Sequence, residues 1–481
     1  MKYVSTRDPL KREFSFIDAV LEGLAPDGGL YVPTDIPEIS PSEQESWKHL
    51  SYQSLCFEIL RNFSDPAEVD DQALRSMISA AYTPSFECPE VAPTVTVGPM
   101  GVMELFHGPT YAFKDVALQL LGQLFDFALR ARNAKMTILG ATSGDTGSAA
   151  IAGVKGRANI DCVILFPLGK TSHIQELQMT SNLDANIHCL AVKDSVFDDC
   201  QSIVKSCFND AQFNKEMSLG AVNSINWARI LAQIVYYVYA SLQRGSKDHP
   251  VTFVVPTGNF GNILAGYYAQ RMGFPIKHLL IASNTNDILP KFLDSGKYKI
   301  SAKVVPTMSP SMDIAVSSNF ERFLYELFGK DGSKTSDKFN QLKSSGEFAV
   351  TESELHACKS VFSAIAVSES ETLKTISDVF AKHQYLLCPH SAVGYGAALE
   401  YLRHHPEDNV ITLATAHIGK FTENILSNLS NKENDGGKFR DAVANSVPEK
   451  LKKLEKSETR RFDIANSVDA VKDYLRNHIH K

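Results

Sequence analysis

The sequence lacks the features that identify several large classes of protein. Its eight cysteines form no C-x-x-C pair and show no short regular spacing, which argues against a disulfide scaffold and a structural zinc site. The most apolar helical stretch, residues 230–242, is shorter than the roughly 20 residues that a membrane-spanning helix needs. The N-terminus has no apolar signal segment, and Asp8 and Glu13 argue against a mitochondrial presequence. We therefore expect a cytoplasmic protein with reduced thiols, no metal ion and no membrane partner.

Positively charged residues are fewer than negatively charged ones. The chain has 48 Lys+Arg against 55 Asp+Glu, a formal net charge of −7, so we do not expect nucleic acid as a partner. With 44% hydrophobic and 21% charged residues, the composition is that of an ordinary globular protein. The length of 481 residues corresponds to about three folding units at roughly 150 residues each.

The pattern of apolar residues divides the chain into three parts. Residues 1–93 carry helical patterns and predict a small, mainly helical N-terminal domain. Residues 94–427 alternate short aliphatic runs with helix-length segments, which is typical of βαβ units and parallel sheets. Charge dominates residues 428–481, which predicts a solvated helical tail. The buried strands that we expect are 135–139, 161–166, 187–192, 251–255, 278–283 and 410–414.

One glycine-rich loop follows the expected strand 251–255. Open α/β sheets bind ligands beyond the carboxyl ends of their strands, so such loops are candidate sites. The segment PTGNFGN, 256–262, has two glycines three residues apart directly before a helical pattern. It can direct several backbone N–H groups and a helix N-terminus at a phosphate. The glycines are equally consistent with a plain turn of the chain.

A second loop, GATSGDTGSAA at 140–150, follows the strand 135–139. Its backbone amides and hydroxyl groups can bind a carboxylate by the same physics. Two such loops imply one ligand with two anionic ends, or two ligands. Neither loop has G-x-G-x-x-G spacing. A Walker A motif ending at Gly169-Lys170-Thr171 is also excluded, because Ile164 stands where it needs a glycine.

Lys114 stands between Phe113 and Asp115 at the entrance to an apolar helical pattern, 116–127. A surface lysine that extends its ammonium to water is one interpretation. The other is a desolvated amine that becomes nucleophilic and holds a carbonyl cofactor as a Schiff base. A phosphate loop, a carboxylate loop and a reactive lysine together are what a pyridoxal phosphate enzyme acting on an amino acid requires.

Six motifs in chain order resemble the threonine synthase family of fungal and bacterial type, and the opening APDGGLYVP at 25–33 is similar to that family's N-terminal domain. The resemblance implies the fold-type-II pyridoxal phosphate architecture, with two open parallel-sheet α/β subdomains, roughly 130–225 and the remainder of the catalytic region. The motifs are HGPTYAFKD (107–115), GATSGDTGSAA (140–150), IQELQMT (174–180), AVNSINWARILAQ (221–233), PTGNFGNILAGY (256–267) and LATAH (413–417).

The resemblance also implies roles for single residues. Lys114 resembles the Schiff-base lysine, and Thr415 is similar to the residue whose hydroxyl meets the pyridine nitrogen. Arg229 is implied to bind the substrate phosphate; as a surface arginine it would interrupt an otherwise apolar helix, at a cost. Lys170 is either a second phosphate partner or an exposed turn lysine. The cofactor-phosphate loop is Gly258, Asn259, Phe260, Gly261 and Asn262, and the other substrate contacts are Ser143, Asp145, Thr146, Asn223 and Ser224.

The family reaction converts O-phosphohomoserine and water into L-threonine and phosphate by γ-elimination and β-addition of water. The resemblance leaves two alternatives open: a phospho-lyase that releases 2-oxobutyrate and phosphate, and a non-catalytic homologue that only binds the cofactor. The chain departs from the family's T-A-H-P-A-K-F segment at Ile418 and Gly419, where a looser turn is expected. His107, His390 and His417 are interpreted as hydrogen-bonded residues that orient loops, and an acid/base role is the alternative for His417. The sequence does not decide between a monomer and a homodimer.

Overall fold

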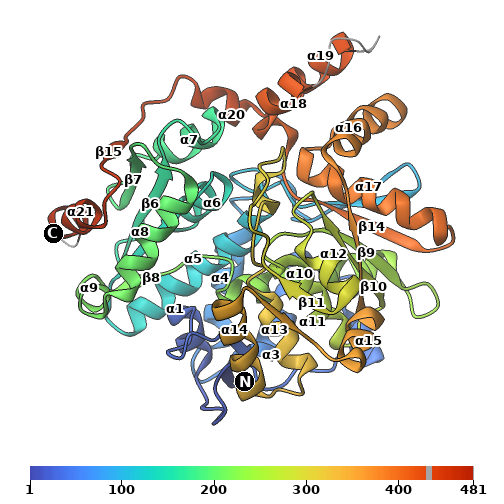
Figure 1. Cartoon of the computed structure of the whole chain (residues 1–481), viewed down its shortest axis with the longest axis horizontal. Coiled ribbons are helices and arrows are strands. Elements are labelled where there is room, and N and C mark those ends of the chain that lie inside the picture. Colours follow the sequence, from blue (N-terminus) through green and yellow to red (C-terminus); the bar gives the residue numbers. More distant parts are fainter. Residues whose placement is uncertain (429–435, 480–481) are drawn as a thin grey trace.

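The computed structural model describes residues 1–428 and 436–479. Two β-sheets, one parallel throughout and the other parallel except for one edge strand, stand side by side above a mainly helical N-terminal region, and helices cover each sheet (Figure 1). This is the α/β architecture with two subdomains that the sequence predicts. In the described part of the chain, no helix is long and apolar enough to cross a membrane.

The N-terminal region combines a short β-ribbon with four helices. Strands β1 (Tyr3–Ser5) and β2 (Tyr31–Pro33) pair antiparallel. All four helices begin at side-chain caps: Ser15, Ser40, Ser51 and Asp70 each accept a hydrogen bond from the backbone N–H three residues further along the chain. The helices are α1 (Phe16–Glu22), α2 (Pro41–Trp47), α3 (Tyr52–Phe63) and α4 (Asp71–Tyr82).

The larger sheet has the strand order β13-β10-β9-β14-β4-β3, and every neighbouring pair is parallel except β3 with β4. Its strands are buried on both faces: Phe253 and Val255 of β9 pack in one apolar cluster, and Val254 between them packs in another. The strands are β3 (Thr94–Val97), β4 (Met100–Glu104), β9 (Val251–Pro256), β10 (Ile276–Ser283), β13 (Phe362–Ala366) and β14 (Asn409–Ala414).

Helices α10 and α11 cover one face of this sheet, and α16 and α17 cover the other (Figure 1). Their bounds are α10 (Trp227–Arg244), α11 (Gly261–Arg271), α16 (Glu369–His383) and α17 (Pro389–His404). An insertion between β10 and β13 adds α12 (Ile288–Ser295), β11 (Lys297–Lys299), η1 (Pro310–Met312), α13 (Phe320–Leu327), α14 (Gly332–Ser345), β12 (Glu347–Ala349) and α15 (Glu352–Val361).

The smaller sheet is parallel throughout, in the order β15-β7-β6-β5-β8. Its strands are β5 (Met136–Ala141), β6 (Ile160–Pro167), β7 (Ile187–Val192), β8 (Leu219–Gly220) and β15 (Phe462–Ile464). The helices around it are α5 (Lys114–Ala131), α6 (Asp145–Val154), α7 (His173–Thr180), α8 (Phe197–Asn209) and α9 (Ala211–Met217).

Helices α5 and α6 approach each other closely enough to place their N-terminal residues together. A Cβ atom at Gly122 would lie 2.0 Å from the carbonyl oxygen of Gly153, and one at Gly153 would lie 2.4 Å from that of Leu118. Only glycine permits this contact. It packs α5, which begins at Lys114, directly against α6, which begins at Asp145.

The C-terminal segment differs from the solvated helical tail that its charge predicts. It crosses back to the smaller sheet, where β15 pairs in parallel with β7, and Val471 and Leu475 are buried beside α8 (Figure 1). The i, i+4 spacing of these two apolar residues is masked by the charged residues around them. The helices are α18 (Thr422–Asn428), α19 (Gly436–Ser446), α20 (Glu449–Leu454) and α21 (Val468–His478). Residues 429–435 and 480–481 of the predicted tail lie outside the described residues, and the domain limits at 93 and 427 stay a prediction.

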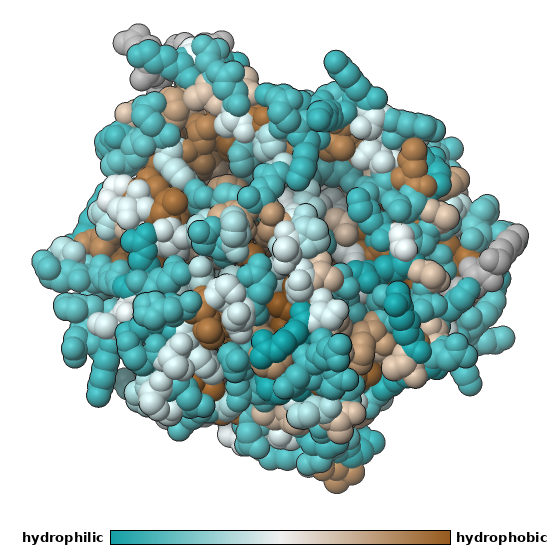
Figure 2. Space-filling view, turned by 180° about the vertical axis from the view of Figure 1, so that it is seen from behind, coloured by the Kyte–Doolittle hydropathy of each residue, from teal (hydrophilic) through white to brown (hydrophobic). Residues whose placement is uncertain are grey.

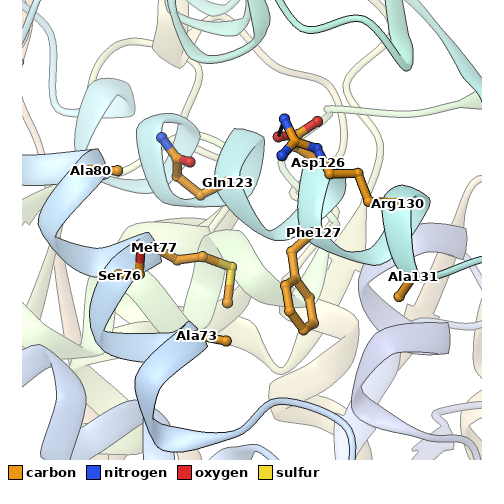
Figure 3. A pocket seen from close by; sticks show the side chains of 9 residues that line it. All are labelled: Ala73, Ser76, Met77, Ala80, Gln123, Asp126, Phe127, Arg130 and Ala131. Carbon is orange, nitrogen blue, oxygen red and sulfur yellow. Dashed lines mark ion pairs between the residues drawn. The ribbon is translucent and has the colours of Figure 1, made fainter.

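Apolar side chains on the surface are scattered. The face shown in Figure 2 is mainly hydrophilic, with small separate apolar areas. The exposed large hydrophobic residues in the described part are Leu10, Leu24, Leu183, Val196 and Val305. A groove of about 430 Å³ lies between α4 and the C-terminal half of α5, where Asp126 pairs with Arg130 (Figure 3). It is far along α5 from Lys114.

Candidate active site

The candidate site lies where loops from both sheets meet at the carboxyl ends of their strands. The loop after β5 leads into α6, the loop after β9 leads into α11, and the loop after β14 forms the short helix η2 (Ile418–Lys420). Helix α5 begins beside them at Lys114. Both glycine-rich loops of the sequence analysis therefore reach one region, as expected for a parallel-sheet architecture.

Lys114 is buried, with 8% of its surface exposed, so the interpretation as a surface lysine is wrong. Its Nζ atom donates to Ser311 Oγ at 3.2 Å and lies 3.8 Å from Asp145 Oδ2. Burial lowers the pKa of Lys114 to about 8; the charge of Asp145 opposes this shift, and the charges of Arg229 and Lys420 add to it. A lysine with this pKa exchanges protons readily near neutral pH.

The turn before Lys114 is held by Asp115. Its carboxylate accepts hydrogen bonds from the backbone N–H of Thr110 at 2.8 Å and from Thr110 Oγ1 at 2.7 Å. Burial raises the pKa of Asp115 to about 6, although the bonds from Thr110 oppose the shift. The turn also places Tyr111 at a positive φ of 59°. Asp115 thus fixes the backbone that leads into Lys114.

Asp145 is the centre of a buried charge cluster. Its Oδ1 atom lies 2.8 Å from Lys420 Nζ and accepts a hydrogen bond from Gln175 Nε2 at 2.9 Å. Burial favours the neutral acid, but the charges of Lys420 and Lys114 outweigh it and hold the pKa of Asp145 well below its usual range. Asp145 is therefore a carboxylate. Lys420 is not among the predicted site residues; the available signal is a lysine placed between Gly419 and Phe421, directly after the last predicted strand and its LATAH motif.

The loop after β9 has the geometry of an anion cradle. Within the described residues, no protein acceptor binds the backbone N–H groups of 258–263, and the Nδ2 atom of Asn262 is buried without a partner. A Cβ atom at Gly258 would lie 2.7 Å from the carbonyl oxygen of Ser311, so close approach requires glycine there. The positive φ of this loop belongs to Phe260, at 64°, and to neither glycine. A turn alone would not leave six donors free at a helix N-terminus.

Arg229 lies in the first turn of α10 and is 4% exposed, so the interpretation as a surface arginine is wrong as well. Its Nη1 atom donates to the carbonyl of Val222 at 3.0 Å, and its Nε atom has no partner. No carboxylate forms an ion pair with Arg229 among residues 1–428 and 436–479, and burial lowers its pKa to about 10. A buried guanidinium without a counter-ion indicates a site for an anionic ligand.

The loop before Arg229 is tied to the cradle by Asn319. The Nδ2 atom of Asn319 donates to the carbonyls of Ser224 and Asn259, each at 3.0 Å. Asn223 is exposed and Ser224 is partly buried in this loop. The two predicted anion sites are therefore neighbours joined by one side chain.

The loop after β5 presents a second set of free donors. Thr142 Oγ1 accepts from the backbone N–H groups of Gly144 and Gly147, both at 2.9 Å. The N–H groups of Ser143, Asp145 and Thr146 bind no acceptor in the described chain. Ser143 is exposed and Thr146 partly buried, consistent with contact to a ligand. Lys170 is exposed in the turn after β6, and its role stays a prediction.

Thr415 and two histidines complete the site. Thr415 is 6% exposed, and its backbone N–H donates to Ser391 Oγ at 3.1 Å. His390 Nε2 accepts from the backbone N–H of Ser311 at 3.2 Å, and burial lowers the pKa of His390 to about 4. The neutral ring thus holds the segment that contacts both Lys114 and Gly258.

The departure at Ile418 and Gly419 forms a closed turn instead of the looser one expected. His417 Nδ1 accepts the backbone N–H of Gly419 at 3.0 Å, and burial lowers the pKa of His417 to about 4. The short helix that follows ends at the buried Lys420. His107 contacts Glu104 at 2.8 Å. All three histidines have the hydrogen-bonded, loop-orienting contacts that the sequence predicts.

The donor set fits a phosphate-bearing carbonyl compound such as pyridoxal phosphate. It combines an amine of lowered pKa, a cradle of free N–H groups and a hydroxyl at Thr415. Arg229 is available to bind a second anion. The described residues hold no group of three or more His, Cys, Asp or Glu side chains that could bind a metal ion.

Three family models cover most of the chain. Residues 2–82 match the threonine synthase N terminus, 78–339 match the pyridoxal-phosphate dependent enzymes, and 391–475 match the C-terminal region of threonine synthase. The middle match spans more than half of the 481 residues.

Full-length relatives agree with these models. Threonine synthase of Saccharomyces cerevisiae is 42% identical over 100% of this chain and 98% of its own. The crystal structure of pyridoxal phosphate-bound threonine synthase from Brucella melitensis superposes with a TM-score of 0.90 at 42% identity and covers 100% of both chains. Threonine synthase-like 2 of Xenopus laevis is 34% identical over 98% of this chain and 96% of its own.

Proposed function

Because the chain belongs to the threonine synthase family of pyridoxal phosphate-dependent lyases, we propose that its site converts O-phosphohomoserine and water into L-threonine and phosphate. The observation that carries this proposal is that the site contains two buried cations, Lys114 and Arg229, and two separate sets of hydrogen-bond donors that can bind anions. One set suits a cofactor phosphate, and the other suits a substrate that brings its own phosphate.

Three parts of the chain would hold the cofactor. The backbone of Gly258, Phe260 and Gly261 offers its free N–H groups to the phosphate, the hydroxyl of Thr415 is available to the ring nitrogen, and Lys114 supplies the amine. The side chains of Asn259 and Asn262 belong to the same loop, with the unpartnered Nδ2 of Asn262 as a further donor. When bound, pyridoxal phosphate supplies a ring that withdraws electrons from the carbon atoms next to the substrate's amino group.

Lys114 is the base that moves protons at Cα and Cβ of the substrate. Its depressed pKa leaves a substantial fraction of neutral amine near pH 8, which is the form that accepts a proton. Asp145, at 3.8 Å, is ionised and stabilises the protonated amine after each transfer. The amine can therefore accept and return protons without leaving the site.

Arg229, Asn223 and Ser224 hold the substrate phosphate, and Ser143 and Thr146 hold its carboxylate with their hydroxyls and backbone N–H groups. The bond from Cγ to the phosphate oxygen breaks, and the electron pair leaves with the phosphate, whose growing charge Arg229 stabilises. Cγ takes up a proton and becomes the methyl group, water adds its oxygen to Cβ and releases a proton, and Cα regains its proton from Lys114. A phosphate retained beside Arg229 keeps the intermediate enclosed while this happens.

The test is product analysis. The purified protein, incubated with pyridoxal phosphate and O-phosphohomoserine, is expected to release threonine and phosphate in equal amounts. Release of 2-oxobutyrate in place of threonine would identify the phospho-lyase alternative. The closer relation to the yeast enzyme than to threonine synthase-like 2, 42% against 34% identity, supports the synthase. Absence of both products would leave the non-catalytic homologue, which the burial of Lys114 argues against.

The remaining proposals concern the surroundings of the enzyme. We propose a cytoplasmic location, supported by eight free thiols, seven of them buried. Partners other than the small-molecule substrate are not expected, and the choice between monomer and homodimer stays a prediction.

A further inference from the structure

Lys420 is a buried lysine that connects the two subdomains at the site. Its side chain has no exposed surface, and its Nζ atom lies 2.8 Å from Asp145 Oδ1. It also donates to the carbonyl of Thr110 at 2.7 Å. Lys420 follows β14 of the larger sheet, whereas Asp145 begins the helix after β5 of the smaller sheet. The ion pair therefore spans the boundary between the two.

Both contacts of Lys420 lead to Lys114. Through Asp145 the path is direct, because Asp145 Oδ2 lies 3.8 Å from Lys114 Nζ. Through Thr110 the path runs to Asp115, which accepts two hydrogen bonds from Thr110 and is the next residue after Lys114. The side chain of Lys420 thus supports the amine of Lys114 from two sides.

We propose that Lys420 is a positioning residue for the reaction: it fixes Asp145 and the Thr110 turn around the Lys114 amine and compensates the charge of Asp145. This inference rests on the proposed function, in which Lys114 moves the substrate protons. It assigns Lys420 no contact with substrate or cofactor.

The charges around Lys114 give the sign of the effect. The charged groups that face it are Asp145, Asp115, Arg229 and Lys420, and His390, a further titratable group there, is neutral because burial lowers its pKa to about 4. Without Lys420, Asp145 keeps Lys114 as its only cation within ion-pair distance among the described residues. The Lys114 ammonium is then stabilised and its pKa rises, so a larger fraction of the base stays protonated at neutral pH.

The experiment compares K420M with K330M in the holoenzyme. Lys330 is the matched control, since its Nζ atom donates to the carbonyl of Thr34 in the N-terminal region, away from the site. We expect K420M to lower kcat by about tenfold or more, with KM within about threefold of wild type. Without substrate, the pH midpoint of the cofactor's visible absorbance should move upward by about half a unit or more. K330M should leave kcat and the midpoint unchanged.

Two further variants separate charge from packing. K420Q keeps a donor without the charge and should also raise the midpoint, which keeps the test available if K420M does not fold. The double variant K420M/D145N removes both charges, so its midpoint should return toward that of wild type. A wild-type midpoint and kcat in K420M and K420Q, or a loss of thermal stability alone, would overturn the assignment. The spectral readout needs no substrate, so a protein that makes no threonine would refute the proposed function and still test Lys420.

Discussion

Replacement of Arg229 by methionine should separate function from stability, because this buried guanidinium forms a single hydrogen bond with the part of the chain that the structure describes. A bidentate contact to the substrate phosphate contributes about 1.5–3 kcal/mol, and its loss should lower kcat/KM by about 10- to 150-fold. Arg229→Lys should recover only part of this, since a point charge does not reproduce the two-pronged contact. Product phosphate should inhibit the wild type competitively and the variants less.

The folded state should tolerate the same change. Removal of Arg229 leaves the Val222 carbonyl without its donor, at about 1 kcal/mol, but it also removes a buried charge that has no counter-ion among residues 1–428 and 436–479. These effects oppose each other, so the free energy of unfolding should change by about 1 kcal/mol or less. Arg322 is the matched control, because it is also buried with its pKa lowered to about 10 by burial.

Arg322 differs from Arg229 because each of its three side-chain nitrogen atoms donates to a protein acceptor. It donates to the carbonyl of Tyr31 at 2.9 Å, to the carbonyl of Ile225 at 2.6 Å, and to Asn319 Oδ1. Arg322→Met should therefore lower the free energy of unfolding by about 3 kcal/mol or more. Urea denaturation and steady-state kinetics on both variants test the contrast. If Arg229→Met loses cofactor and keeps its KM for O-phosphohomoserine, the two anion sites are assigned the wrong way round.

Three other predictions concern the cofactor side of the site. Lys114→Ala should fold and bind pyridoxal phosphate without forming a covalent link; retention of the wild-type visible spectrum and turnover would refute the role of Lys114. Gly258→Val should weaken cofactor binding by about tenfold or more, as measured by fluorescence titration, and Gly261→Val should weaken it less. A Cβ atom at Gly258 would lie 2.7 Å from the backbone of Ser311, whereas a Cβ atom at Gly261 would meet side chains at 3.3 Å. Since the pKa of Lys114 is lowered to about 8 and the neutral amine is the base, kcat should rise with pH through about 8; a kcat that falls over this range would contradict that sign.

The strands and the two loops could be predicted because their signals are local. Residues 187–192 have the same limits in the structure as in the prediction, and the strand expected at 251–255 extends by one residue to Pro256. Buried parallel strands are continuous aliphatic runs, which stand out against the helices between them. Glycines directly after such runs mark the ligand side of the sheet without knowledge of the strand order.

The parts that could not be predicted depend on contacts between distant residues. Lys420 meets Asp145 across 275 positions of sequence, and Ser311 reaches Lys114 from an insertion that the motifs do not include. Likewise, strand β15 has three residues and depends on β7 for its hydrogen bonds, so no local pattern could distinguish it from the charged segment around it. The positive φ at Phe260 shows the same limit, since glycine is the residue that a sequence pattern would choose for it.

The chain as a whole is negatively charged, whereas the buried residues of the site carry a net positive charge. This difference favours small anions that enter the site over large ones that stay at the surface. Lys114, Arg229 and Lys420 are three buried cations, while Asp145 is one firmly ionised carboxylate and Asp115, with its pKa raised to about 6, is the other. The buried excess of positive charge acts at short range, where the dielectric is low, whereas the overall charge of −7 acts at the surface and is screened within about 8–10 Å. We expect the surface to repel a polyanion. We expect a small phosphate ester that fits the site to be desolvated beside Arg229, so that it gains the local attraction while the surface repulsion is largely screened.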